Sequence, residues 1–149
     1  IFPRLWNSIS PCNKNWKIVG EKQSERWCKT CPKCAFSYAL LAAFLPKKTL
    51  TGIFGGDFFA APALQTLYRQ LLGLEGYKPF ECVGTVEETS AAFYLAHERG
   101  ELEDTEAMKA FVEKVLPKIK DPKKLVEEML TPSSEHAIPK EFQSVIPRP

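Results

Sequence analysis

Four cysteines constrain this chain more than any other feature of its sequence. They are spaced C-x15-C-x2-C-x2-C and fall at Cys12, Cys28, Cys31 and Cys34. A two-residue gap lets the backbone turn consecutive sulfurs toward one point, and the distant first cysteine supplies the fourth ligand. Four thiolates complete a tetrahedral zinc site and leave no position for a water molecule. The spacing therefore predicts a structural zinc knuckle that holds the first third of the chain together.

Two other uses of these cysteines stay open. Disulfides are disfavoured because the cysteine count is odd, five in all, and no secretory signal is seen. An iron–sulfur cluster is a closer competitor, since C-x2-C-x2-C also begins the bacterial ferredoxin motif. The C-x3-C-P element that ends that motif is missing here. Zinc is the preferred interpretation.

Charge and hydropathy argue against nucleic-acid and membrane partners. The chain has 20 Lys and Arg against 18 Asp and Glu, a balance that argues against a dedicated nucleic-acid binder. The locally basic first third balances the negative charge of four thiolates on a divalent ion. The longest apolar stretch, Ala35 to Leu45, is too short for a bilayer. Reduced thiols and the lack of a targeting segment favour the cytoplasm. Because the chain starts at Ile1, it is expected to be part of a longer polypeptide.

The fold is expected to be mainly α-helical. Prolines, capping side chains and glycines mark the ends of the predicted helices. The first of them begins at Pro32 and is apolar nearly all round, so it should form the centre of the core. Residues 77–84 have no helical period and are expected to be extended or a loop. The predicted helices are Pro32–Leu45, Thr49–Phe54, Ala61–Leu72, one capped by Thr85 that ends near Gly100, Asp104–Ile119 and Asp121–Leu130.

These elements divide the chain into three regions. Residues 1–34 form the zinc-binding loop region and residues 32–100 the helical core. Residues 101–149 turn to charged amphipathic helices and a proline-rich tail, which are expected to be peripheral. The pair Gly55-Gly56 inside the core region is interpreted as a helix C-cap. It lacks the lysine or serine that a phosphate-binding loop needs.

Several motifs together resemble a known family. The run from Trp27 to Phe36 holds three of the cysteines, Cys12 begins the stretch C-N-K-N, and I-F-G occupies residues 53–55. The segment K-P-F-E-C-V-G at 78–84 leads into two glutamates at 87 and 88. Over residues 10–96 the chain resembles the C-terminal part of the UDP-N-acetylmuramoyl-L-alanyl-L-glutamate epimerases.

The resemblance implies a larger, ATP-dependent enzyme. Members of that family invert the terminal L-glutamate of UDP-MurNAc-L-Ala-L-Glu to D-glutamate in peptidoglycan precursor synthesis, and their ATP-binding half resembles PP-loop pyrophosphatases. The related 7-cyano-7-deazaguanine synthases bind zinc with a similar cysteine spacing. No PP-loop occurs in this chain, so ATP and Mg²⁺ are expected on an N-terminal half that lies upstream or on another chain. The chain is then the C-terminal portion of a larger α/β PP-loop-like enzyme and is inactive alone.

The segment 78–88 supplies candidates for the chemistry. Inversion requires removal of the proton α to a carboxyl group, and adenylylation of the carboxylate makes that proton acidic enough for a thiolate or carboxylate base. The candidate acid–base residues are Cys82, Glu81, Glu87 and Glu88, and Lys78 would bind the charged UDP-linked muramoyl dipeptide. A non-catalytic interpretation also stays open, in which the cysteine is a small buried residue, the glutamates cap a helix and the lysine is solvated.

Two other functions stay open on the sequence. The zinc element also suits another PP-loop enzyme that modifies a nucleobase or tRNA, and a zinc-stapled module that binds nucleic acid or protein. The long motif at 78–88 favours the epimerase, because a bare zinc module has no need of it. Trp16 and Trp27 flank the ligands and are expected to cover the site. His97 and His136 are isolated and are given no role.

Overall fold

The computed structural model describes residues 3–8, 10–16, 19–20, 23–133, 135 and 137–145 of the 149-residue chain. Within these ranges the chain forms helices and no β-strand, which confirms the mainly α class, and no helix is long and apolar enough to cross a bilayer. The α-helices are α1 Pro32–Ala42, α2 Lys47–Phe54, α3 Gln65–Leu71, α4 Val86–Arg99, α5 Glu106–Lys114 and α6 Pro122–Leu130. The 3-10 helices are η1 Pro3–Ser8, η2 Asn13–Trp16, η3 Pro62–Leu64, η4 Leu116–Lys118 and η5 Lys140–Val145.

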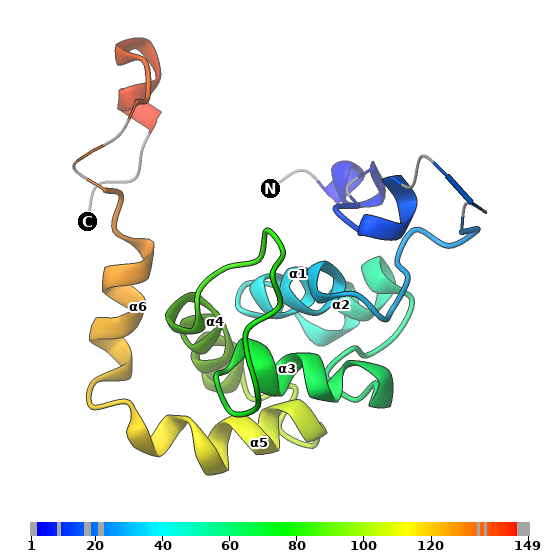
Figure 1. The fold of residues 1–149 in the computed structure, drawn as a ribbon. Coiled ribbons are helices and arrows are strands. Elements are labelled where there is room, and N and C mark those ends of the chain that lie inside the picture. The colour runs from blue at the N-terminus through cyan, green and yellow to red at the C-terminus, as the bar shows by residue number, and fades with distance from the viewer. Residues whose placement is uncertain are drawn as a thin grey trace.

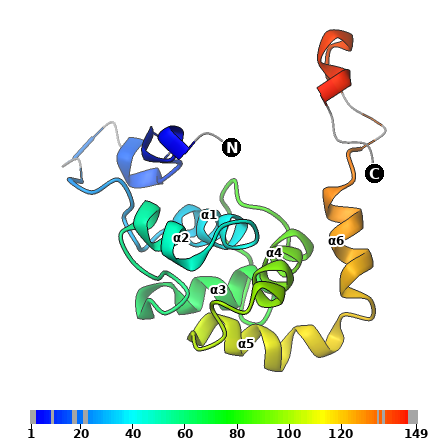
Figure 2. The ribbon, with the colours of Figure 1, turned by 180° about the vertical axis from the view of Figure 1, so that it is seen from behind.

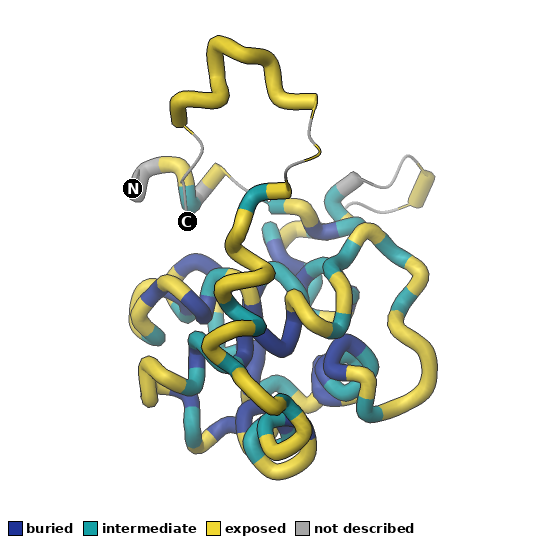
Figure 3. The backbone as a smooth tube through the Cα atoms, turned by 90° about the vertical axis from the view of Figure 1, so that its left-hand side faces the viewer, coloured by how far each residue is buried: buried dark blue, intermediate teal, exposed yellow. Residues whose placement is uncertain are grey.

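Helix α1 lies at the centre of the helical bundle, as predicted (Figure 1). It packs against α2, α3 and α4, and α4 continues the packing to α5 and α6. The segment that precedes α1 lies on one side of the bundle, and α6 stands beside α4 with the tail beyond it (Figures 1 and 2). Colouring by burial shows a buried centre and an exposed tail (Figure 3).

Aromatic rings connect the elements of the core. Large aromatic side chains each bury a large apolar area and contribute strongly to the stability of a core. Each ring contacts the next one through stacked, edge-to-face or tilted geometry. The centroids of neighbouring rings are 4.2–5.5 Å apart along the series Trp27, Phe54, Tyr38, Phe59, Phe93 and Phe111.

Asp57, which follows the glycine pair, anchors the loop after α2 to the central helix. Its Oδ1 accepts hydrogen bonds from the Tyr38 hydroxyl and from the Phe59 amide, both at 3.0 Å. Its Oδ2 pairs with Lys47 Nζ at 3.3 Å. A half-buried carboxylate with three partners is well satisfied. Asp57 therefore holds the loop in place, and the structure gives it a packing role.

Prolines move two helix boundaries away from their predicted positions. The helix expected to reach Leu45 ends at Ala42. Pro46 disfavours a helical conformation at the residue before it and takes the N-cap position of α2, which begins at Lys47, earlier than predicted. The predicted helix at 61–72 is divided into η3 and α3, and η3 has a proline in its first turn.

Helix α5 belongs to the core, in contrast to the peripheral position expected for it. Met108 and Phe111 are completely buried. The N-cap is Thr105 rather than Asp104, and its hydroxyl accepts a hydrogen bond from the Met108 amide at 3.4 Å. The helix ends at residue 114 instead of 119, where a 3-10 turn with a proline follows. Helix α6 is capped by Asp121, as predicted, and has no buried residue.

Candidate metal centre and the adjoining loop

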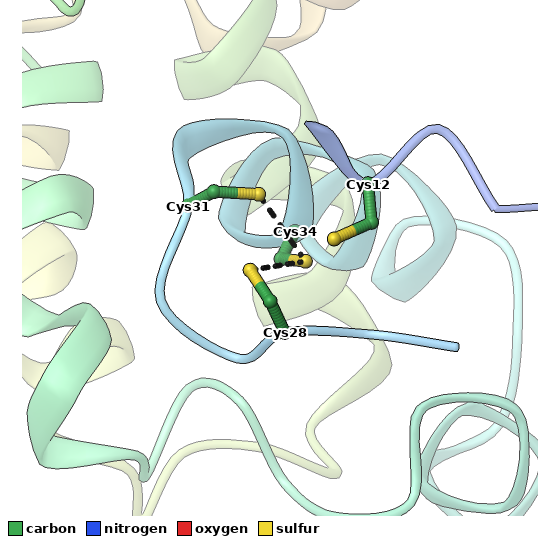
Figure 4. A group of neighbouring side chains, drawn as sticks. All are labelled: Cys12, Cys28, Cys31 and Cys34. Atoms are coloured by element: carbon green, nitrogen blue, oxygen red, sulfur yellow. Dashed lines mark hydrogen bonds between the residues drawn. The ribbon is translucent and has the colours of Figure 1, made fainter. Parts of the chain in front are cut away.

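The four predicted ligands come together at the start of α1 (Figure 4). The Sγ atoms of Cys12, Cys28, Cys31 and Cys34 all lie within 4.8 Å of one another. The Cys34 sulfur is 3.7 Å from that of Cys28 and 3.4 Å from that of Cys31. Thiolates placed tetrahedrally around zinc, with Zn–S distances near 2.3 Å, have sulfurs about 3.8 Å apart. The cluster thus has the size of a four-thiolate metal site.

Local backbone structure turns these sulfurs inward. Cys31 occupies the N-cap position of α1 without a side-chain capping bond, Pro32 begins the helix, and Cys34 lies in its first turn. Lys29 has a positive φ of 58°, a left-handed conformation that reverses the chain between Cys28 and Cys31. The five described cysteines are all free thiols. The sulfur separations far exceed the disulfide bond length of about 2.05 Å, so the disulfide alternative is wrong.

Polar side chains surround the cluster. The Thr30 hydroxyl lies 3.5 Å from Cys28 Sγ and accepts a hydrogen bond from Lys14 Nζ at 2.9 Å. Gln23 Nε2 is 3.8 Å from Cys12 Sγ. Donors in these positions stabilise thiolates and orient them toward a shared cation.

Burial and mutual hydrogen bonding separate the pKa values of the thiols. The hydrogen bond between Cys31 and Cys34, opposed by burial, lowers the pKa of Cys31 to about 4. The same bond, together with burial, raises the pKa of Cys34. Burial raises the pKa of Cys12. One thiolate forms readily here, but further negative charge in so small a volume requires a compensating cation. The donor set therefore fits a divalent metal ion.

Trp27 joins this cysteine knuckle to α2. Its ring is buried and stacks on Phe54 with centroids 4.2 Å apart, and its Nε1 donates to the Ile53 carbonyl at 3.1 Å. Gly55 then ends α2 with a φ of 70°, which confirms the C-cap interpretation of the glycine pair. Residues of the I-F-G motif thus pack against Trp27 at the edge of the knuckle.

His97, which was given no role, takes no part in the cysteine cluster. His97 Nδ1 pairs with Glu103 Oε2 at 3.0 Å. The side chain of Trp16 and the whole of His136 lie outside the described residues.

The loop between α3 and α4 is tied to the knuckle by a hydrogen bond. Asn13 Nδ2, directly after the first metal ligand, donates to Glu81 Oε2 at 2.5 Å. Lys78 Nζ donates to the Val83 carbonyl at 3.2 Å, so the loop folds back on itself. The segment is a loop, as predicted, and Cys82 on it is exposed rather than buried. The structure therefore holds Glu81 against Asn13, next to Cys12, and leaves the Cys82 thiol accessible.

The two glutamates after this loop lie on different sides of α4. Glu88 forms a capping box, in which its Oε2 accepts from the Thr85 amide at 2.6 Å and its amide donates to the Thr85 hydroxyl at 3.1 Å. Glu87 lines a separate cavity of about 310 Å³ among α3, α4 and η4, with Lys118 on its wall. The four candidate acid–base residues are thus not gathered around one point. Glu88 has the capping role that the sequence had left open.

Sequence reasoning missed two residues that shape this loop. Asn13 follows Cys12 in the C-N-K-N motif, but its partner Glu81 lies 68 positions further along the chain. Gly84 is required by close packing, because a Cβ there would come closer than 3.0 Å to the Phe36 ring and to the capping carboxylate. The glycine in the motif K-P-F-E-C-V-G was the available signal for the second of these.

Comparisons with known proteins agree on one family. Residues 8–126 match the family model described as the MurL C-terminal domain. Three curated relatives are named UDP-N-acetyl-alpha-D-muramoyl-L-alanyl-L-glutamate epimerase. The protein of Salinispora tropica is 44% identical over 107 residues, that of a Micromonospora strain 37% over 138, and that of Xanthomonas oryzae pv. oryzae 38% over 132.

These matches cover most of this chain but a minor part of each relative. They include 72%, 93% and 88% of the chain, and 23%, 30% and 29% of the respective relatives. No solved structure matches the chain significantly. Since the family model spans well over half of its length, the chain belongs to the MurL C-terminal domain family.

Proposed function

We propose that this domain is the C-terminal part of an ATP-dependent epimerase that inverts the terminal L-glutamate of UDP-MurNAc-L-Ala-L-Glu during peptidoglycan precursor synthesis in the cytoplasm. The observation that carries the proposal is the match of residues 8–126 to the MurL C-terminal domain, together with three relatives that bear the epimerase name. ATP and Mg²⁺ would bind to a PP-loop-like N-terminal half outside this chain. These names do not favour a nucleobase-modifying enzyme or a nucleic-acid-binding module.

Zinc is the metal that we propose for the cysteine cluster, with a structural role. Cys12, Cys28, Cys31 and Cys34 would hold it, and the four thiolates leave no position for substrate. The ion would supply positive charge that offsets the thiolates. The residues of the knuckle then position Asn13, and through it Glu81, relative to the rest of the loop.

The loop residues would carry the proton transfer. After adenylylation of the glutamate α-carboxylate, a base removes the α-proton and an acid returns a proton to the opposite face. Cys82 is the first candidate because its thiol is exposed and its loop is held by hydrogen bonds at both Lys78 and Glu81. Glu81 is the second candidate, and Glu87 the third. Lys78 would exchange its bond to the Val83 carbonyl for the phosphate or carboxylate of the substrate.

The test is deuterium exchange in the complete enzyme. Cys82→Ser keeps the size of the side chain but raises its pKa far beyond that of a useful base, so exchange of solvent deuterium into the glutamyl α-position should be lost. Pyrophosphate release from ATP in the presence of substrate should persist, which shows that the variant still folds and adenylylates. Full epimerisation by Cys82→Ser would remove the thiol from the mechanism.

Glu81→Gln separates charge from geometry in the same assay. The amide oxygen still accepts the hydrogen bond from Asn13, so the loop should keep its place while the carboxylate base is lost. Loss of exchange in this variant, with exchange intact in Cys82→Ser, would assign the proton transfer to Glu81. A complete enzyme that shows no epimerisation of the muramoyl dipeptide at all would refute the proposed function.

A further inference from the structure

An apolar groove lies between α1, α4 and α6, with a volume of about 220 Å³. Four of its large apolar side chains are exposed, and Phe44 and Leu130 are each 57% exposed. Among the described residues, Glu88 is the only charged side chain on its wall, and its carboxylate is already used in the capping box. Its apolar walls include Phe36, Leu40, Phe44, Leu95, Met129 and Leu130.

The apolar lining of the groove indicates which class of ligand it can bind. A nucleotide or a muramoyl peptide carries several charges, and the wall as described includes no cation to pair with them. Exposed apolar side chains gathered on one face are typical of a protein-binding surface. The helical spacing of Val126 and Met129–Leu130 on α6 places further apolar side chains toward the same groove. The groove therefore fits apolar side chains of another protein segment.

The size of the groove argues that this segment is tethered to the domain. Stable complexes between separate proteins bury roughly 1,200–2,000 Å² in total, and a groove for a few side chains is much smaller than such an interface. A segment on the same polypeptide has an effective concentration on the order of millimolar, so that a small contact suffices. The relatives supply such a segment, because this domain accounts for only 23–30% of their length.

The groove is also continuous with the loop of the proposed chemistry. Gly84 lines the groove, packs against Phe36 and ends the loop that carries Cys82. On the same loop the side chains of Tyr77 and Phe80 are almost fully exposed. Gly84 thus joins the groove to the loop, two positions after the exposed Cys82 thiol.

We infer that this groove between α1, α4 and α6 is the docking site for the part of the same polypeptide that precedes this domain in its relatives. Docking there sets the other part of the enzyme against the loop at 77–84 and encloses the Cys82 thiol. The inference rests on the proposed function only for the identity of that preceding part. It concerns where the two parts meet, not which reaction they carry out.

Photo-cross-linking in the full-length protein tests the docking. Phe44 is replaced by p-benzoylphenylalanine in one sample and Phe142 in a second, and the two are matched because both phenylalanines are 57% exposed. Phe142 lies in η5 on the tail and serves as the control. Irradiation of the Phe44 variant should give at least a tenfold excess of cross-links to peptides of the preceding part over the Phe142 variant. Mixing light and heavy isotope-labelled protein identifies cross-links between chains.

Two results would overturn the inference. One is cross-linking at Phe44 no greater than at Phe142. The other is cross-linking between light and heavy chains, which would make a second copy the occupant. Cross-linking is measured without any enzymatic turnover. Its result therefore tests the docking site separately from the proposed function. An active epimerase without the cross-link refutes only the docking site, and a cross-linked but inactive protein refutes only the reaction.

Discussion

Replacing Gly84 by alanine should destabilise the domain, although the change adds a single methyl group. A Cβ at this position would lie closer than 3.0 Å to two carbons of the Phe36 ring and to Glu88 Oε2. Displacing the ring overpacks the site, which costs about 1–3 kcal/mol. Displacing the carboxylate breaks the capping box of α4, at about 1 kcal/mol. The expected loss of unfolding free energy is therefore about 2–4 kcal/mol.

Urea unfolding followed by far-ultraviolet circular dichroism measures this loss, and Gly52→Ala is the matched control. Gly52 lies inside α2 with no atom within 4 Å of an added Cβ, so alanine there should stabilise by about 0.5–1 kcal/mol. Adding Phe36→Leu to Gly84→Ala should restore part of the loss, because it removes the ring that the methyl group meets. A Gly84→Ala protein as stable as its parent would refute the reasoning from close packing.

Two further predictions concern the metal and the buried phenol. Protein made in zinc-containing reducing medium should hold about one zinc ion per chain, and elemental analysis that finds iron or no metal contradicts this. Cys31→Ser should lower the free energy of unfolding by several kcal/mol. Burial, and then the charge of Asp57, raises the pKa of Tyr38 above its usual value. The protonated phenol is favoured by the fold, so its contribution is complete below about pH 10 and is lost as the pH rises above that value. Tyr38→Phe should lower the free energy of unfolding by about 1.5–3 kcal/mol at pH 8 and by less at pH 11, as measured by urea unfolding. An equal loss at both pH values would show that Tyr38 does not titrate in this way.

Local signals in the sequence predicted most of the helices, and long-range packing explains the differences. Pro32 and Thr85 mark helix starts through their own backbone and side-chain chemistry, so their positions could be read directly. Thr105 and its neighbour are both good caps, and only the packing of α5 decides between them. The charged composition after residue 101 concealed one apolar face that is buried in the core.

The candidate site divides in the same way. A four-thiolate centre demands a fixed set of spacings, so the sequence alone predicted that the four cysteines would meet. The hydrogen bond between Asn13 and Glu81 joins residues 68 positions apart, and neither their residue types nor their spacing predicts it. Whether Cys82 is exposed depends on how its loop packs between α3 and α4, which is a tertiary property.

The series of ring contacts from Trp27 to Phe111 should make the domain unfold in a single transition. Trp27 adjoins Cys28 at one end, and Phe111 lies in α5 at the other. Opening the knuckle would expose the face of Phe54, and each ring uncovered removes support from the next, so partial unfolding confined to the cysteines is unfavourable. A chelator that extracts the proposed zinc ion should therefore act on this domain as a denaturant does, with an effect that extends to helices without cysteine ligands.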